Sequence, residues 1–300
     1  MKAVILAGGT GSRLYPASKV VNKHLLPICD KPMIYYPLTI LIASGISEFC
    51  LITNRQDIKH FKGLLSDGSH LGISIEYVIQ DKPNGIARAL LLAEGFIGSE
   101  NFVLMLGDNF FSGSSVISDA IDGFESGATI FAYRVSNPSE YGVVSFLQSG
   151  KATLIEEKPK VPKSKYAVPG IYIYDARAIQ FAKNVKKSQR GEVEITDVNN
   201  QYLLLNELFV KILRRGYAWL DSGTPEGIFL ASTYIQTIEK SYGQKIGCPE
   251  EASFLKGNIN LKELNKIVSL LPNGGYKDYL DNFVEEHEEQ IKSKIDSCEE

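Results

Sequence analysis

The feature that most constrains the fold is a glycine-rich loop near the start of the chain. It follows a continuous apolar run at residues 3–7, which is typical of a parallel strand buried on both faces. Gly8, Gly9 and Gly11 can adopt backbone conformations that other residues avoid, so the main chain can approach a ligand closely. Successive N–H groups in such a turn bind anions, and in an open α/β sheet this loop would lie at the ligand-binding carboxyl edge.

Apolar runs of strand length alternate with helical patterns along the first third of the chain. The helical segments are residues 33–44, with Pro32 at the first helical position and Gly45 as the stop, and residues 85–96. The strand-like segments of this part are residues 49–53, 75–80 and 102–106. Strands that alternate with helices predict a Rossmann-like, doubly wound α/β sheet with helices on both faces.

The middle and the end of the chain depart from this pattern. Short strand-like runs, separated by turns rich in Pro, Gly and Ser, occupy residues 129–135, 141–146, 153–157 and 170–174. They predict that the sheet continues as a mixed, mostly parallel one. Residues 217–220 are one more strand-like run, which ends at Asp221. Candidate helices follow at residues 228–242, 261–271 and 279–295. We therefore expect an α/β core at residues 1–224 and a helical C-terminal segment at residues 225–300, packed on the core and available for contacts between subunits.

Composition and charge argue against several classes of protein. With 44% hydrophobic and 22% charged residues the chain is an ordinary globular protein, and its net charge of −3 argues against nucleic-acid binding. No apolar run approaches the roughly 20 residues that span a bilayer, and glycines interrupt the N-terminal run too early for a secretory signal. The four cysteines are scattered without a CxxC pair. These features predict a cytoplasmic protein with free thiols, no membrane segment and no zinc site.

The glycine loop fits neither of the two common phosphate-binding fingerprints. The dinucleotide pattern GxGxxG fails at Leu14, and the ATPase pattern GxxxxGK[ST] is absent. Instead, Arg13 and Lys23 follow the glycines. A planar guanidinium and a compact ammonium could hold a triphosphate together with the loop amides and stabilise the charge of leaving pyrophosphate. The alternative is a tight strand-to-helix turn with basic residues on the surface.

Two aspartates far apart in the sequence could form a metal site. Asp108 follows a strand in LMLGDN, and Asp221 follows a strand in AWLDSGT. Both would lie at carboxyl ends of strands, so both could face one cleft. Mg²⁺ favours one or two carboxylates together with phosphate oxygens, so the pair predicts a Mg²⁺ site against the α-phosphate of a nucleotide. Each aspartate alone could equally belong to a turn or cap a helix.

Several motifs in the same order resemble those of the sugar-nucleotide pyrophosphorylases. GGTGSRLYPASKVVNKHLLP at residues 8–27 resembles the signature GGxGxRLxPxTxxxxKxLLP. Further segments resemble the short-form glucose-1-phosphate thymidylyltransferases, namely KPMIYYPL (31–38), GDN (107–109), EEKP (156–159), RGEVEITDVN (190–199), YAWLDSGT (217–224) and CPEE (248–251). The resemblance extends to about Tyr279, so it covers nearly the whole chain.

The resemblance implies a nucleotide-diphospho-sugar transferase fold of GT-A-like type, with a nucleotide half at about residues 1–110 and a sugar half at about residues 111–224. The implied nucleotide-binding residues are Leu6, Gly8, Gly9, Gly11, Arg13, Lys23, Gln80 and Gly85. The implied sugar-phosphate-binding residues are Asn109, Tyr141, Gly142, Glu157, Lys158, Val168, Arg190 and Trp219. Catalytic roles are implied for Arg13, Lys23 and Asp108, and Mg²⁺ binding for Asp108 and Asp221.

The reaction that this resemblance implies is Mg²⁺-dependent nucleotidyl transfer. The substrates would be dTTP and α-D-glucose 1-phosphate, and the products dTDP-glucose and diphosphate, at the first step of dTDP-deoxysugar synthesis of the dTDP-rhamnose type. Such chemistry needs positioning and charge stabilisation rather than a covalent nucleophile. The resemblance also implies a homotetramer in the cytoplasm with feedback inhibition by a dTDP-sugar, and no nucleic-acid or membrane partner.

Departures from the family pattern leave the choice of substrates open. His24 stands where glutamine is usual, and Pro169 stands where threonine is usual. The same chemistry with UTP or another sugar 1-phosphate is therefore an alternative. A glycosyltransferase would usually show an Asp-x-Asp metal motif, whereas Asp108 is followed by Asn109 and Phe110. A regulatory homologue without activity would be favoured by loss of the basic and acidic site residues, which are all present.

Overall fold

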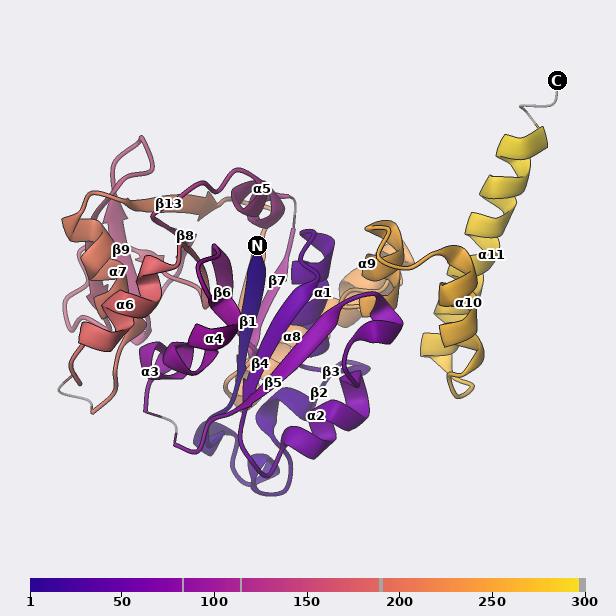
Figure 1. Ribbon diagram of the computed structural model, residues 1–300, viewed down its shortest axis with the longest axis horizontal. Coiled ribbons are helices and arrows are strands. Elements are labelled where there is room, and N and C mark those ends of the chain that lie inside the picture. Colours follow the sequence, from indigo (N-terminus) through magenta and orange to yellow (C-terminus); the bar gives the residue numbers. More distant parts are fainter. Residues whose placement is uncertain (83, 114, 189–190, 297–300) are drawn as a thin grey trace.

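The computed structural model describes residues 1–82, 84–113, 115–188 and 191–296 (Figure 1). Within these residues ten strands form one sheet: β1 (Lys2–Ala7), β4 (Glu48–Thr53), β5 (Ser74–Ile79), β6 (Phe102–Leu106), β8 (Ala128–Arg134), β9 (Gly142–Phe146), β10 (Ala152–Glu157), β11 (Tyr166–Ala167), β12 (Ile171–Tyr174) and β13 (Leu208–Leu213). The strand order is β10-β9-β11-β8-β12-β6-β1-β4-β5, and β13 pairs with β8. Strands β6, β1, β4 and β5 are parallel, whereas β12 pairs antiparallel with β6 and β8. The predicted mixed α/β sheet is confirmed.

Helices cover both faces of this sheet. One face carries α1 (Tyr35–Ala43), α2 (Ile58–Leu65) and α5 (Val116–Asp122). The other face carries α3 (Ile86–Leu90), α4 (Glu94–Ile97), α6 (Arg177–Asn184) and α7 (Ile195–Leu204). Successive side chains of a strand point to opposite faces, so Ala3 and Ile5 of β1 pack in the first layer and Val4 packs in the second. The continuous apolar run at the start of the chain follows from this burial on both sides.

Parallel pairing brings four loops to one edge of the sheet. Strand β1 pairs with β4 and β6 so that Leu6 lies beside Ile52 and Leu106. Strand β5 continues the parallel order beyond β4. The loops after these four strands begin at Gly8, Asn54, Gln80 and Gly107. Parallel strands end at the same edge, which is where ligands bind in open α/β sheets.

Two short ladders lie outside the large sheet. Strand β7 (Asn109–Ser112) pairs antiparallel with β14 (Ala218–Asp221), which places Asp221 opposite Asn109. Because Asn109 directly follows Asp108, this ladder brings together two aspartates that are distant in the sequence. Strands β2 (Pro27–Ile28) and β3 (Lys31–Pro32) form a hairpin that precedes α1.

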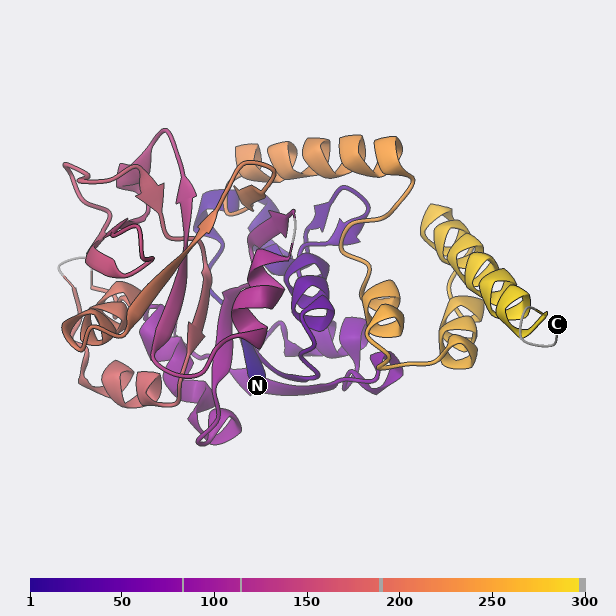
Figure 2. The ribbon, with the colours of Figure 1, turned by 90° about the horizontal axis from the view of Figure 1, so that it is seen from above.

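The C-terminal part is helical and comprises α8 (Pro225–Tyr242), α9 (Pro249–Leu255), α10 (Leu261–Ser269) and α11 (Gly275–Asp296). Helix α8 contacts β14 and β2, and α9 packs against α1. Helices α10 and α11 contact each other around a small apolar cluster that includes Cys248, Leu264 and Leu280. Figure 2 shows α11, in yellow, projecting from the body of the molecule at the end opposite to α6 and α7. The predicted helical C-terminal part is thus present, while the division into domains stays a prediction.

Some element boundaries differ from the prediction. Pro32 is not the first residue of α1, which begins at Tyr35. It ends the two-residue strand β3, a position where its missing N–H is tolerated. The helix expected at residues 85–96 is divided into α3, a 3₁₀ turn at Leu91–Ala93 and α4, and such turns are common connectors at helix ends. Strands β7 and β13 have no counterpart among the predicted strands.

Two predictions about the whole chain can be compared with the described residues. The helices in this part of the chain include none that is long and apolar enough to cross a membrane. The cysteines in this part are free thiols, as predicted, at positions Cys29, Cys50 and Cys248. Cys298 lies outside the described residues.

Candidate active site

The glycine-rich loop after β1 is held by side chains from two other segments. Gly9 and Gly11 have φ values of 97° and 61°, in the left-handed region that favours glycine. Asn54 donates a hydrogen bond to the Gly9 carbonyl at 3.0 Å, and Ser18 donates one to the Gly11 carbonyl at 2.7 Å. These bonds engage two loop carbonyls with protein donors, which reduces the repulsion that their oxygens would exert on a bound anion.

Lys23 and Asp108 form an ion pair across the carboxyl edge of the sheet. Lys23 begins the 3₁₀ turn Lys23–Leu25, and Asp108 lies two residues after β6 ends. Asp108 also accepts a hydrogen bond from Asn109 Nδ2 at 3.0 Å. Burial alone would raise the pKa of Asp108, but the nearby Lys23 ammonium outweighs it and holds that pKa well below its ordinary value. The carboxylate is therefore ionised when no ligand is bound.

Asp221 is the second carboxylate of the site. Its Oδ1 accepts the Gly223 N–H at 2.9 Å, and the neighbouring Ser222 N–H donates to the carbonyl of Asp108 at 2.9 Å. Burial and the nearby charge of Asp108 raise the pKa of Asp221. Two carboxylates that repel each other in a partly buried place are a suitable donor set for a hard divalent cation. The two predicted metal ligands are thus brought together, and they fit Mg²⁺.

Arg13 lies beside the same pair of carboxylates. It is in the 3₁₀ turn Ser12–Leu14, at the end of the glycine loop. A Cβ atom on Gly223 would lie 2.6 Å from Arg13 Nη2 and 2.9 Å from Asp221 Oδ1. Only glycine therefore leaves room for the guanidinium at this carboxylate. Arg13 and Lys23 each lie beside one aspartate of the pair, where they could bind phosphate oxygens.

A cavity of about 560 Å³, which we call the sugar cavity, opens at these aspartates. Arg13, Asp108 and Asp221 line it together with residues from the antiparallel part of the sheet. The sugar-phosphate residues predicted from the sequence that line it are Asn109, Tyr141, Gly142, Glu157, Lys158, Val168 and Trp219. The remaining predicted residue, Arg190, lies outside the described residues. Segments spread over more than half of the chain therefore meet in one space, although the role of each residue stays a prediction.

Hydrogen bonds orient the walls of the sugar cavity. Thr196 donates to Glu157 Oε2 at 2.6 Å. Trp219 Nε1 donates to Asn109 Oδ1 at 2.7 Å. The rings of Trp219 and Tyr141 meet edge to face with their centroids 5.1 Å apart. A carboxylate, an amide and two aromatic rings are thus held in place before any ligand binds.

A second cavity of about 780 Å³, which we call the loop cavity, lies on the glycine-loop side. Gly9, Lys23 and Gln80 line it. Gln80 is buried, and its Oε1 lies 2.5 Å from the position that a Cβ atom on Gly8 would take, so glycine permits this contact. The predicted nucleotide-binding residues, all described by the structure, that line neither cavity are Leu6, Gly8, Gly11 and Gly85. Gly85 precedes Ile86, which does line the sugar cavity.

Sequence reasoning missed the polar residues that enter the sugar cavity around the start of α7. These residues are Glu192, Glu194, Thr196 and Asn199. They lie within RGEVEITDVN, where only the arginine received a role. The position of this motif in the family resemblance is the signal that could have found them. Their spacing alone could not, because it does not show which face of α7 meets the sheet.

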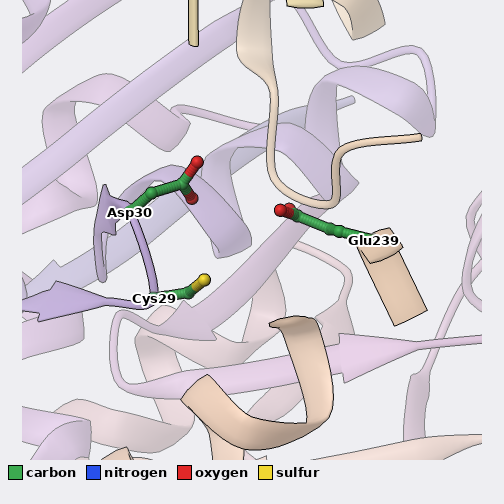
Figure 3. A group of neighbouring side chains, drawn as sticks. All are labelled: Cys29, Asp30 and Glu239. Atoms are coloured by element: carbon green, nitrogen blue, oxygen red, sulfur yellow. The ribbon is translucent and has the colours of Figure 1, made fainter. Parts of the chain in front are cut away.

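Another group of charges, which we call the hairpin clamp, joins the β2–β3 hairpin to α8. Figure 3 shows Cys29 and Asp30 of the hairpin near Glu239 of α8, and one ligand atom from each lies within 4.8 Å of the others. Lys31 pairs with Asp30 and, at 2.9 Å, with Glu239, while Lys245 pairs with the same two carboxylates. Two ammonium groups thus already neutralise both carboxylates. We therefore interpret the clamp as a structural ion-pair network and not as a metal site.

Known proteins that resemble this chain identify its family. The model of the nucleotidyl transferase family matches residues 2–238. Glucose-1-phosphate thymidylyltransferases of Neisseria meningitidis and Mycobacterium tuberculosis are 46% and 47% identical to the chain over 282 residues, which cover 93% of this chain and 98% of each relative.

Solved structures resemble the chain in the same way. A structure described as a glucose-1-phosphate thymidylyltransferase of Bacillus anthracis in complex with sucrose is 42% identical, with a TM-score of 0.72 over 78% of this chain and 94% of that chain. A UDP-glucose pyrophosphorylase complexed with UDP-glucose, 24% identical, shares the fold with a TM-score of 0.70 over 79% of this chain and 98% of that one. The chain therefore belongs to the nucleotidyl transferase family, among its glucose-1-phosphate thymidylyltransferases, and is an enzyme that transfers a nucleotidyl group to a sugar 1-phosphate.

Proposed function

We propose that the enzyme transfers a thymidylyl group from dTTP to α-D-glucose 1-phosphate in the presence of Mg²⁺, with dTDP-glucose and diphosphate as products. The observation that carries this proposal is the lining of the sugar cavity, where Asp108, Asp221 and Arg13 share one space with Glu157. A site where a sugar phosphate reacts needs two kinds of group. Some must bind phosphate and metal, and a carboxylate must accept hydrogen bonds from the sugar hydroxyls. The volume of about 560 Å³ lies within the roughly 300–1,000 Å³ typical of small-molecule sites.

The reaction forms one P–O bond and breaks another. An oxygen of the sugar 1-phosphate attacks the α-phosphorus of the nucleotide, and the bond to diphosphate breaks with its electron pair leaving on diphosphate. The attacking oxygen is already anionic, so no general base is needed. Arg13 and Lys23 would bind phosphate oxygens and stabilise the charge on the departing diphosphate. A Mg²⁺ ion held by Asp108 and Asp221 would further neutralise charge on the phosphates.

The other contribution of the chain is orientation. Glu157, which Thr196 holds by a hydrogen bond, can accept hydrogen bonds from sugar hydroxyls. Trp219 and Tyr141 form an aromatic wall that limits where the sugar ring can lie. Holding both reactants in one orientation replaces a bimolecular encounter by an effectively unimolecular step, which accounts for much of the rate in such reactions.

The choice of base rests on a less selective feature. The Gln80 side-chain amide offers a donor and an acceptor that suit the imide edge of a pyrimidine. Thymine and uracil share this edge and differ by one methyl group. UTP is therefore the second candidate nucleotide, and other sugar 1-phosphates are candidates in the sugar cavity.

A substrate panel tests the proposal. The full chain is assayed with Mg²⁺ and dTTP or UTP, each combined with several sugar 1-phosphates, and diphosphate release and the nucleotide-sugar product are measured. We expect the highest kcat/KM for dTTP with glucose 1-phosphate. Turnover with UTP and none with dTTP would show that the nucleotide substrate is UTP. A higher kcat/KM for another sugar 1-phosphate would show that glucose 1-phosphate is not the preferred sugar substrate. The control is Asp122→Asn, which alters an exposed aspartate at the end of α5 and should behave like the wild type.

Assembly and regulation form a further part of the proposal. We infer a cytoplasmic homotetramer that a dTDP-sugar inhibits and that supplies a dTDP-rhamnose type of pathway. Exposed Phe229 and Leu230 of α8 support an apolar contact with another subunit. Light scattering measures the mass in solution, and a monomer would contradict the tetramer. Inhibition assays with added dTDP-sugar test the feedback, which unchanged rates would contradict.

A further inference from the structure

The two residues on either side of Lys23 are buried. Asn22 is 7% exposed at the edge of the loop cavity, and His24 is 1% exposed in the short 3₁₀ turn that Asn22 caps. Neither belongs to the groups that the proposed function places on substrate. Burial of two polar side chains next to a catalytic lysine raises the question of what they bind.

Asn22 uses both polar atoms of its side chain within the protein. Its Nδ2 donates to Asp57 Oδ2 at 2.8 Å and to the carbonyl of Ala7 at 3.1 Å. Its Oδ1 accepts the backbone N–H of His24 at 2.9 Å and contacts His24 Nδ1 at 2.9 Å. A backbone N–H can only donate, so the orientation of the amide is determined and His24 Nδ1 carries the proton of this second bond.

These hydrogen bonds join the segment that carries Lys23 to two neighbouring loops. Ala7 is the last residue of β1, and Asp57 follows β4. Asp57 Oδ2 also accepts from Asn54 at 2.9 Å, and Asn54 holds the carbonyl of Gly9 in the glycine loop. One connected network therefore ties the lysine segment to the loop that would bind the nucleotide phosphates.

The ring of His24 contacts a third loop, the one after β6. A Cβ atom on Gly107 would lie 2.7 Å from His24 Cδ2, so the imidazole packs directly on this glycine. The Gly107 N–H in turn donates to the carbonyl of Leu6 at 2.9 Å. Gly107 immediately precedes Asp108. The His24 ring thus supports the backbone next to Asp108. Lys23, which precedes His24 in the chain, pairs with the Asp108 carboxylate.

We propose that Asn22 and His24 are positioning residues that hold the Lys23 ammonium and the Asp108 carboxylate in the arrangement required for nucleotidyl transfer. The proposal rests on the proposed function, because it assigns these groups to the reacting phosphates. A lysine side chain has a long flexible stem, so its charge is placed only when its backbone is held. A displacement of about 1 Å at such a site costs roughly 10²-fold in rate.

His24→Phe tests the hydrogen bond while keeping a ring against Gly107. We expect kcat to fall by roughly 10- to 100-fold while KM for the sugar phosphate stays within about twofold, because the sugar residues lie on the other half of the sheet. His24→Asn places an amide nitrogen near the position of Nδ1 and should restore kcat to within about fivefold of the wild type. The control is His70→Phe, at an exposed position, which should leave kcat unchanged.

A second measurement does not depend on turnover. The ion pair with Asp108 protects the Lys23 amine, so its acetylation by an acylating reagent, measured by peptide mass spectrometry, should be several-fold faster in His24→Phe than in the wild type. Exposed Lys262 serves as the internal reference and should react equally in both proteins. Asn22→Ala carries the same expectations and replaces His24→Phe if that variant does not fold.

The two measurements separate the two proposals. Unchanged kcat or unchanged Lys23 reactivity in a folded variant overturns the positioning role. Failure of the wild type to turn over any nucleotide and sugar phosphate overturns the proposed function instead, and Lys23 reactivity then decides the positioning role alone.

Discussion

Lys31 and Lys23 both pair with carboxylates, but the surroundings of the two lysines differ. In the hairpin clamp, Lys31 is 2% exposed and lies between Asp30 and Glu239. At the candidate active site, Lys23 is 17% exposed and pairs with Asp108 at the edge of two cavities. Residues of the same types therefore form one group that is closed within the protein and one that opens to a ligand.

The pKa values of the carboxylates express this difference. Burial would raise the pKa of Asp30, but Lys245 and Lys31 lower it below its ordinary value. Burial and the charge of Asp108 raise the pKa of Asp221, and no neighbouring cation outweighs them. Charges in the clamp are thus balanced, whereas Asp221 is in an environment that a cation would improve. In the clamp both carboxylates form ion pairs with lysines, whereas at the candidate active site Lys23 pairs with Asp108, and Asp221 accepts the backbone N–H of Gly223.

The largest expected effect is the loss of activity in Asp108→Asn. The substitution removes the charge that pairs with Lys23 and would bind the metal, so kcat should fall by roughly 10³-fold or more. Asp30→Asn makes the same chemical change in the clamp and should keep kcat within about twofold in folded enzyme. Steady-state kinetics at saturating Mg²⁺ measures both. Equal losses in the two variants would remove the distinction between the two groups.

The next effect in size is a loss of stability in Lys31→Met. The substitution leaves Asp30 and Glu239 with one lysine instead of two, and breaking a buried ion pair costs about 3 kcal/mol of unfolding free energy. Urea unfolding measures this change, and kcat of the folded fraction should stay near the wild-type value. Lys262→Met, at an exposed position, is the matched control. Unchanged stability in Lys31→Met would show that the clamp does not stabilise the fold.

A smaller effect of opposite sign is expected for Asp221→Asn. The folded-state pKa of Asp221 lies above the ordinary value of 3.8, so ionisation above that pH destabilises the folded state. Replacing the carboxylate should therefore stabilise the metal-free protein near neutral pH, by less than the loss expected for Lys31→Met, although activity is lost. The difference in melting temperature should disappear as the pH falls toward 3.8. A less stable variant at neutral pH would contradict the repulsion between Asp221 and Asp108.

The smallest effect is expected for Cys29→Ser in the clamp. Since two lysines already neutralise the carboxylates, the thiol has no metal to bind, and the unfolding free energy should change by less than about 0.5 kcal/mol. Stoichiometric Zn²⁺ or Cd²⁺ should leave the melting temperature of the wild type unchanged. A metal-dependent rise that Cys29→Ser abolishes would show that the clamp binds metal and is not a purely structural ion-pair network.

Much of the fold follows from local patterns in the sequence. The apolar run at residues 3–7 predicts a strand buried on both faces, because alternate side chains of β1 pack in two helical layers. The glycines after it predict an anion-binding loop, and Gly9 and Gly11 do have the left-handed conformations that this requires. Asp108 follows β6 at the carboxyl edge of the sheet, as its place in the sequence predicts.

Other features have no local signal. The β7–β14 ladder that joins Asp221 to Asn109 depends on the pairing of segments more than a hundred residues apart. Pro32 resembles a helix start in the sequence but belongs to a hairpin, because its neighbours pair across the turn. Glu192 and Glu194 enter the sugar cavity only because α7 packs beside β10.

The groups available for phosphate chemistry can be read from the sequence, because glycine conformations and the charges of arginine, lysine and aspartate are properties of single residues in a local order. Which of these charges are buried among partners and which face a ligand depends on the folded chain. Lys23 meets a partner 85 residues away, and Lys31 meets one 208 residues away. Because these partners are distant in the sequence, the fold determines the surroundings of each lysine. It buries Lys31 in the hairpin clamp and leaves Lys23 beside a cavity.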